Sequence, residues 1–215
     1  VFSMDGDIAP LPDLTELKEK YGAILVVDDA HATGVLPPRG RGSADYFGLA
    51  GKIEIQMGTF SKALGTYGAY MCAARPLVDY FINKCRTFIF NTGLPPAIAG
   101  ATIKSLALLS HHPERLASLL ENEEIFRREM EARGRKISSV TAIVPIPVGR
   151  DHDTMAVSRL LYDRGVFIQG IRPPTIPEGK GRLRLTLMAT HTPDMIKAAA
   201  LQIDESLKEL GIEPY

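Results

Sequence analysis

The stretch that decides the fold reads Ala23-Ile24-Leu25-Val26-Val27-Asp28-Asp29-Ala30-His31. Five apolar residues in a row are typical of a parallel strand that is buried on both faces between helices. The run then changes abruptly to two acids and a histidine. Because ligands of open α/β sheets bind beyond the carboxyl ends of the strands, this segment predicts an α/β protein with polar chemistry directly after the strand.

A second predicted strand, residues 53–57, leads into Gly58-Thr59-Phe60-Ser61-Lys62-Ala63-Leu64-Gly65. A lysine in such a position can lose its proton through desolvation and attack a carbonyl group. Thr59 and Ser61 could donate hydrogen bonds to a phosphate nearby. A carboxylate at Asp28 could keep the pyridine nitrogen of a cofactor protonated, which lets the ring accept electrons.

Each of these residues also has a plain structural interpretation. A single lysine in a loop is most often a solvated surface charge, and an acid after a strand is often a helix N-cap. His31 alone is typical of a hydrogen-bonded residue, and Arg184 on an alternating strand is by default exposed to solvent. The functional prediction therefore depends on the combination, because separate loops supply what one cofactor needs.

The rest of the chain alternates between strand and helix patterns, which indicates an α/β protein. Residues 182–188 alternate leucines with Arg182, Arg184 and Thr186, so one face of that strand is apolar. We expect a domain boundary near His112-Pro113, which divides the chain into residues 1–112 and 113–215. Further strands are expected at 67–74, 140–148 and 166–171, and helices at 14–21, from Pro76, and at 98–109, 114–133, 154–164 and 193–210.

Composition restricts the class of protein. The 215 residues are 45% hydrophobic and 23% charged, the proportions of a globular protein with a sizeable core. Basic and acidic residues both number 25, and no charge run indicates nucleic acid or an acidic membrane as a partner. No stretch approaches the ~18 apolar residues of a membrane span. Val1 is not an initiator, so we expect residues upstream of it.

The cysteines and histidines give no metal-binding pattern. Cys72 and Cys85 have no metal-ligand spacing, and free thiols fit the reducing cytoplasm, where we expect the protein to be located. His111-His112 has no further ligand at a suitable distance in the sequence, so no metal site is predicted there.

Several motifs together resemble the α-oxoamine synthases, which are fold-type I pyridoxal-phosphate (PLP) enzymes related to class II aminotransferases. They occur in the family's order, from the first residue to about the last helix. The resemblance implies the second half of the large-domain sheet, which binds the cofactor, in residues 1–112. It implies a smaller C-terminal α/β domain in residues 113–215. The motifs are Phe2-Ser3-Met4-Asp5-Gly6-Asp7, Val27-Asp28-Asp29-Ala30-His31-Ala32-Thr33-Gly34, Gly40-Arg41-Gly42, residues 58–65, and Leu94-Pro95-Pro96.

The resemblance implies catalytic roles for three residues that follow the two predicted strands. Lys62 would carry pyridoxal 5'-phosphate as a Schiff base and later move the Cα proton of the substrate. Asp28 would pair with the pyridinium nitrogen. His31 would lie near the phenolic oxygen of the cofactor. Ala32 departs from the glycine that many members have, a small change.

The remaining implied roles concern binding. Ser3 would contact the side of the cofactor ring, Thr59 would bind its phosphate or lie beside it, and Arg184 would hold the substrate carboxylate with its guanidinium. Asn91-Thr92-Gly93 replaces a more hydroxyl-rich version of a phosphate-binding segment, and Thr92 would keep part of that role. The aromatic residue that stacks on the ring in the family has no counterpart in these residues.

The implied activity is the condensation of an amino acid with an acyl-CoA. Ile171-Arg172-Pro173-Pro174-Thr175-Ile176-Pro177 favours the member that joins L-alanine to pimeloyl-CoA in biotin biosynthesis. The family also implies a cytoplasmic homodimer. One alternative is glycine C-acetyltransferase or another synthase of the family, and a second is an inactive truncated fragment or dimerisation partner. A nicotinamide-dependent oxidoreductase is disfavoured because no G-x-G-x-x-G follows a strand.

Overall fold

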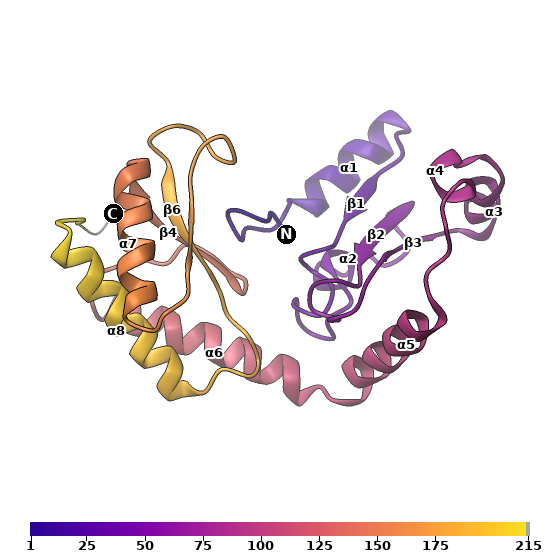
Figure 1. The fold of residues 1–215 in the computed structure, drawn as a ribbon. Coiled ribbons are helices and arrows are strands. Elements are labelled where there is room, and N and C mark those ends of the chain that lie inside the picture. Colours follow the sequence, from indigo (N-terminus) through magenta and orange to yellow (C-terminus); the bar gives the residue numbers. More distant parts are fainter. Residues whose placement is uncertain (214–215) are drawn as a thin grey trace. The chain divides into compact units, whose positions relative to one another are not determined.

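Three strands, β1 (Val26–Asp28), β2 (Ile55–Thr59) and β3 (Ala69–Ala73), form the first sheet of the computed structural model, which describes residues 1–213 (Figure 1). β1 runs parallel to β2 with Asp28 beside Met57, and β3 runs antiparallel to β2 on its other side. The carboxyl ends of β1 and β2 therefore lie at the same edge of the sheet. This pairing therefore places the two polar segments that follow these strands next to each other.

The helices of the first sheet's unit are α1 (Leu11–Tyr21), α2 (Ser43–Tyr46), α3 (Arg75–Lys84), α4 (Arg86–Ile89) and α5 (Pro96–His111). α1 begins three residues before the predicted start, because Pro12 is well suited to the first turn of a helix. It ends at Gly22, whose left-handed φ of 62° lets its N–H bond the carbonyl of Lys18. The core of this unit is a cluster of Leu11, Val27, Ala44 and Ile53.

The prediction that residues 23–27 are buried on both faces was wrong for this chain. Only Val27 is buried, whereas Ile24 is 66% and Val26 is 57% exposed. The side chain of Val27 reaches the core beside α1, but no described element covers the opposite face of β1. The strand itself is also shorter than the apolar run, because only Val26–Asp28 pair with β2.

The second sheet has the order β4-β6-β5, with β4 (Ile143–Gly149) and β5 (Gln169–Ile171) both antiparallel to β6 (Gly181–Thr186). Its burial confirms the predicted alternation in β6. Leu183 and Leu185 are buried, whereas Arg182 and Arg184 on the other face are only partly covered.

Three helices accompany the second sheet: α6 (Glu114–Glu131), α7 (Asp151–Asp163) and α8 (Pro193–Glu209). α7 packs against all three strands and against α8. Thr192 caps α8, the helix predicted at 193–210: its hydroxyl accepts a hydrogen bond from the N–H of Met195 at 3.3 Å. No helix within residues 1–213 is long and apolar enough to cross a membrane.

The contacts divide the chain into two compact units, which we describe separately. The first contains Val1 and Ile8–Leu116, and the second contains Phe2–Asp7 and the residues from Ala117 onward. The α/β class is confirmed, since each unit combines a sheet with helices. The assignment of residues 1–112 to a cofactor-binding domain and 113–215 to a small domain stays a prediction.

Candidate active site

The two adjacent acids after β1 have opposite environments. Asp29 is buried, and its carboxylate accepts hydrogen bonds from the backbone N–H of Ser43 at 2.9 Å and from the Ser43 hydroxyl at 2.5 Å. Gly42 packs directly on this carboxylate, because a Cβ at Gly42 would lie 2.3 Å from Asp29 Oδ2. Asp29 therefore has a structural role, and it anchors the start of α2.

Asp28, in contrast, is exposed, and one of its carboxylate oxygens has a donor among the described residues. Oδ1 accepts from the backbone N–H of Ala30 at 2.9 Å. This short-range contact is an Asx turn and not a helix N-cap, because no helix begins directly after Asp28. The other oxygen has no hydrogen bond from the described residues, so it remains available to a ligand. His31 follows in the turn in which Ala32 and Thr33 donate to the carbonyl of Asp29, and it is partly exposed.

Lys62 lies in a loop that is fixed at both ends. The backbone N–H of Thr66 donates to the carbonyl of Phe60 at 2.8 Å, and the N–H of Phe60 donates to the carbonyl of Gly68 at 2.9 Å. From α5, the Ser105 hydroxyl donates to the carbonyl of Leu64 at 2.7 Å, and Leu64 itself is buried. The loop backbone is thus held by hydrogen bonds, while the Lys62 side chain extends from it.

The Lys62 amine has a neutral partner. Nζ donates to Thr59 Oγ1 at 3.2 Å, and no acidic group within residues 1–213 pairs with it. Lys62 is exposed, so the described residues do not supply the desolvation that the sequence suggested. An amine without an ion-pair partner can still be used for covalent chemistry, but its activation needs more than the burial found here.

A close backbone approach brings the two loops together. Gly34, at the end of the segment after β1, has a φ of +81°, and a Cβ there would lie 2.7 Å from the Cβ of Ala63. The loop after β1 and the loop of Lys62 are therefore in van der Waals contact. This contact, together with the parallel pairing of β1 with β2, places Asp28, His31 and Lys62 at one edge of the sheet.

Sequence reasoning missed a group of residues on β3. Tyr70 shares a hydrogen bond with Thr33 (2.7 Å between the hydroxyl oxygens), and its ring packs against Phe60 with centroids 5.2 Å apart. Burial raises the pKa of Tyr70 from its ordinary value. Gly58 makes room for it, since a Cβ there would lie 2.5 Å from the Tyr70 hydroxyl. The signal for this packing in the sequence is Gly58, because a glycine inside a strand can mark a close approach by another group.

A cavity of about 590 Å³ adjoins these residues, but it is not the predicted site. It is lined by Thr33, Phe60 and Tyr70 together with Leu106 and Leu109 of α5, whereas Asp28, His31 and Lys62 do not line it. In the described residues 1–213, no group of three or more histidine, cysteine or acidic side chains could hold a metal ion.

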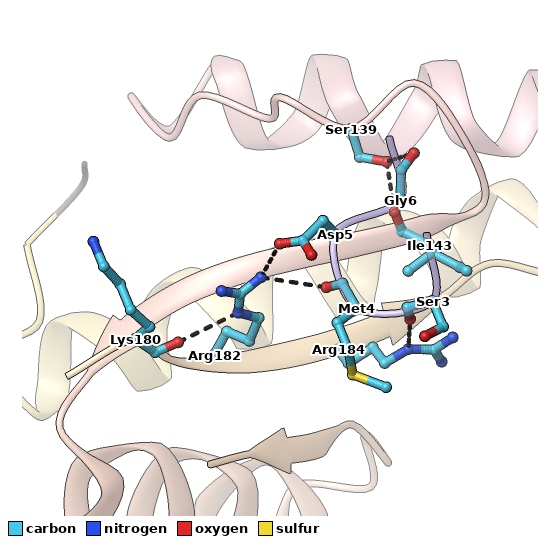
Figure 2. Close-up of polar contacts among 9 residues, drawn as sticks. All are labelled: Ser3, Met4, Asp5, Gly6, Ser139, Ile143, Lys180, Arg182 and Arg184. Carbon is cyan, nitrogen blue, oxygen red and sulfur yellow. Dashed lines mark hydrogen bonds and ion pairs between the residues drawn. The ribbon is translucent and has the colours of Figure 1, made fainter. Parts of the chain in front are cut away.

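The other predicted site residues lie elsewhere in the chain. Thr92 is exposed between α4 and α5, and its hydroxyl forms no hydrogen bond with the described residues. Ser3 and Arg184 belong to the second unit, where Arg184 Nε donates to the backbone carbonyl of Ser3 at 2.6 Å (Figure 2). The structure thus brings Ser3 and Arg184 into contact, and it places Asp28, His31 and Lys62 in neighbouring loops at one edge of the first sheet.

The residues of the first unit fit PLP. Among the described residues, Lys62 presents an amine whose only partner is a hydroxyl, and Asp28 presents one carboxylate oxygen without a hydrogen bond, which could accept from a ring nitrogen. Thr59 and Ser61 place hydroxyl groups beside the lysine. An amine, an acid and hydroxyl donors from the ends of two adjacent parallel strands are the set of groups that a pyridine aldehyde phosphate requires.

These features define an α/β protein in which a lysine, an acid and hydroxyl groups follow two adjacent parallel strands. The chain belongs to the family of class I and II aminotransferases, whose sequence profile matches residues 1–203. Its α/β fold is that of fold-type I PLP-dependent transferases, because it superposes on solved members over almost its whole length.

The relatives give a finer likeness. The chain is 49% identical to 8-amino-7-oxononanoate synthase of Citrifermentans bemidjiense, over 99% of this chain and 55% of that protein. It is similar to serine palmitoyltransferase from S. paucimobilis solved with a bound PLP–myriocin aldimine (TM-score 0.93, 30% identity, 99% of this chain and 54% of that one). It is also similar to 8-amino-7-oxononanoate synthase from Francisella tularensis (TM-score 0.85, 28% identity, 99% and 62%).

These comparisons confirm the resemblance that the motifs indicated. The chain spans about half the length of the curated relatives that it matches. The residue roles, in contrast, depend on the motifs and on the geometry above.

Proposed function

We propose that the protein is a PLP-dependent synthase that condenses L-alanine with pimeloyl-CoA and releases CoA, carbon dioxide and an α-amino ketone. The observation that carries this proposal is the pinned loop of Lys62 beside the loop of Asp28 and His31. The identity of 49% to an 8-amino-7-oxononanoate synthase supports this choice of reaction. The homodimer and the cytoplasmic location stay predictions.

PLP, when bound, supplies an electron sink for the bonds around the substrate Cα. Lys62 would hold the cofactor covalently through Nζ and, when its amine is free, remove and return the Cα proton. Asp28 would accept the hydrogen bond from the protonated ring nitrogen with the carboxylate oxygen that Ala30 does not use. Because a carboxylate favours a nearby positive charge, it would keep that proton in place.

The other predicted residues would bind and orient. His31, in the turn after Asp28, would contact the phenolic oxygen. Thr59 would donate to the phosphate, which requires its hydroxyl to leave Lys62 Nζ, now 3.2 Å away. Thr92 would add a further phosphate contact, and Ser3 would lie beside the ring. Arg184 would bind the substrate carboxylate with two parallel N–H groups.

The first test is covalent trapping of the cofactor in the full-length protein. PLP followed by borohydride should leave a reduced adduct on the peptide that contains Lys62, detected by mass spectrometry. Lys62→Ala should remove this adduct, whereas Lys104→Ala, which removes an exposed lysine from α5, should keep it. An adduct on any other lysine, or none, would overturn the proposal.

The second test concerns the substrates. CoA release should be measured with L-alanine, glycine and L-serine, each paired with pimeloyl-CoA, acetyl-CoA and palmitoyl-CoA. The proposal predicts the highest kcat/KM for L-alanine with pimeloyl-CoA. A preference for glycine with acetyl-CoA would instead assign the protein as a glycine C-acetyltransferase.

A further inference from the structure

The chain begins with a small closed loop, Phe2–Asp7, which we call the N-terminal loop. The N–H of Phe2 donates to the carbonyl of Asp7 at 3.0 Å, and the N–H of Gly6 donates to the carbonyl of Phe2 at 2.9 Å. The loop belongs to the second unit, although the residues that follow it belong to the first. It is therefore held in place by the second sheet rather than by its neighbours in sequence.

Gly6 anchors one end of the N-terminal loop beside β4. Its carbonyl accepts hydrogen bonds from the hydroxyls of Thr141 at 2.8 Å and Ser139 at 3.4 Å. Gly6 has a φ of +69°, and a Cβ there would lie 2.0 Å from the carbonyl oxygen of Ile143 (Figure 2). Only glycine allows both this backbone conformation and this close approach.

Two arginines of β6 hold the other end of the loop. Arg182 has a carboxylate partner there, whereas Arg184 bonds a neutral carbonyl group. Arg182 forms an ion pair with Asp5, and its Nη1 also donates to the carbonyl of Met4 at 3.4 Å (Figure 2). Arg184, on the same face two residues later, donates through Nε to the carbonyl of Ser3 at 2.6 Å. In residues 1–213, no carboxylate pairs with Arg184.

The Arg184 guanidinium is held at two of its three nitrogens. Besides the contact of Nε with Ser3, Nη1 donates to the Thr186 hydroxyl at 3.0 Å, and Nη2 has no partner among the described residues. Partial burial lowers the pKa of Arg184 from its ordinary value. A partly desolvated charge without a counter-ion is costly, and a ligand carboxylate would compensate it.

We propose that the N-terminal loop and Thr186 are a positioning device that aims Arg184 at the carboxylate of the amino-acid substrate. Because the Ser3 carbonyl accepts from Nε, the edge formed by Nε and Nη2 cannot bind a carboxylate in a bidentate way. Nη2 and the remaining N–H of Nη1 are then the fork that binds it. This inference rests on the proposed function and adds Thr186, Gly6 and the Ser3 carbonyl to it as positioning groups.

Thr186→Val tests the device in the full-length protein, because Thr186 is exposed and valine suits a strand. We expect the KM for L-alanine to rise by about 2- to 12-fold, the range for losing one typical intramolecular hydrogen bond. The kcat should change less than the KM, because the carboxylate keeps its charge during binding and Cα proton removal and is lost only in the later release of carbon dioxide. Thr186→Ser should restore the wild-type KM. Thr190→Val, at an exposed threonine without a hydrogen bond in the described residues, should leave it unchanged.

A matched pair of ligands separates positioning from a general structural effect. Ethylamine is L-alanine without its carboxylate, and the affinity of both can be measured by absorbance titration of the PLP-loaded protein. Thr186→Val should weaken the binding of L-alanine and leave the affinity for ethylamine unchanged. Gly6→Ala should give the same pattern. If Gly6→Ala does not fold, Asp5→Asn takes its place, because it removes the ion pair with Arg182. Asp5→Asn should lower the affinity for L-alanine by about 2- to 5-fold and leave that for ethylamine unchanged.

Equal weakening of both ligands would overturn the positioning role. Arg184→Lys distinguishes this failure from failure of the proposed function. If the wild-type protein releases CoA and Arg184→Lys raises the KM for L-alanine but Thr186→Val does not, the function stands and the positioning proposal is wrong. If the wild-type protein releases no CoA with any amino acid, the proposed function fails and the positioning proposal fails with it.

Discussion

Asp28 and Asp29 show how far a single residue's role depends on the direction of its side chain. Successive side chains at the end of a strand point to opposite faces, so one acid is exposed and its neighbour is buried against Ser43. The sequence alone leaves both acids as candidates for the cofactor nitrogen. The motif resemblance selects Asp28, and the hydrogen bonds of Asp29 agree with that selection because they leave Asp29 no free oxygen.

The two acids should therefore respond differently to the same substitution. Asp29→Asn should lower the free energy of unfolding by about 1–3 kcal/mol, because one buried donor of Ser43 loses its acceptor. Asp28→Asn should change it by less than about 0.5 kcal/mol, while it slows Cα proton exchange of L-alanine in the PLP-loaded protein. Urea unfolding and deuterium exchange followed by NMR measure the two effects. Normal exchange in Asp28→Asn would contradict its assigned role.

Glu123 on α6 is a second residue whose behaviour the sequence did not indicate. Its side chain is buried, and Oε1 has no hydrogen-bond partner within residues 1–213. Burial raises its pKa to about 7, and the charge of Arg127 opposes this effect only in part. The folded protein therefore binds this proton more tightly than the unfolded chain does. Stability is highest below the ordinary glutamate pKa and falls as the pH rises toward 7.

Glu123→Gln should remove this pH dependence. Because the glutamine carries no charge at any pH, we expect the free energy of unfolding at pH 8 to rise by up to about 3 kcal/mol, with little change near pH 4.5. Urea unfolding at both pH values gives the comparison. Glu121→Gln, an exposed glutamate on the same helix, is the control and should change stability little. A Glu123→Gln gain that is equal at both pH values would show that the charge is not the cause.

At the scale of elements, period and capping signals predicted most of the fold. The long helices α5 to α8 and all six strands occur where the apolar patterns indicated them. α2 and α4 were missed because each has only four residues, too few to show a helical period. The predicted ends of β1 were wrong for another reason. An apolar run shows which residues can be buried, but pairing with β2 decides which of them form the strand.

The cap of α8 is an element whose energy can be measured alone. Thr192→Ala removes the hydroxyl that accepts from Met195 N–H, and it should lower the free energy of unfolding by about 1 kcal/mol. Thr192→Ser keeps an acceptor and should cost only a few tenths of that amount. Thr190→Ala controls for the loss of an exposed threonine just before the helix. Chemical denaturation with one fitted m-value measures all three variants.

At the scale of the whole molecule, the two units bury their apolar residues unequally. α3 and α4 have no buried residue, and α5 buries only Thr102, so Tyr80, Phe88 and Phe90 are exposed. In the second unit, α8 alone buries Ile196, Ala200, Ile203 and Leu207. The loops that contain Asp28 and Lys62 thus depend on the small cluster around Leu11 and on hydrogen bonds. No periodicity in the sequence could have shown this difference, because it arises from what covers each helix.

The second unit is also tied together by a buried ion pair. Arg135, between α6 and β4, donates through Nε to Asp204 of α8 at 2.8 Å and through Nη2 to the carbonyl of Ile212 at 3.3 Å. The side chains are only 7% and 4% exposed, and Lys208 adds a second cation to Asp204 at 2.7 Å. Burial acts to raise the pKa of Asp204, but the hydrogen bonds from Lys208 and Arg135 outweigh it, so that pKa lies below its ordinary value.

Asp204→Asn should therefore destabilise the second unit by about 3–5 kcal/mol at pH 7, because the charge of Arg135 stays buried without a partner. Since the folded-state pKa is depressed, the contribution of Asp204 is complete above the unfolded aspartate pKa of about 3.9 and is lost as the pH falls through the folded value. The same change at Asp163, whose pair with Arg159 is largely exposed, should cost less than about 0.5 kcal/mol. Urea unfolding from pH 7 down to pH 3 measures both variants. Equal losses at the two sites would mean that burial of the Arg135–Asp204 pair does not determine its energetic effect.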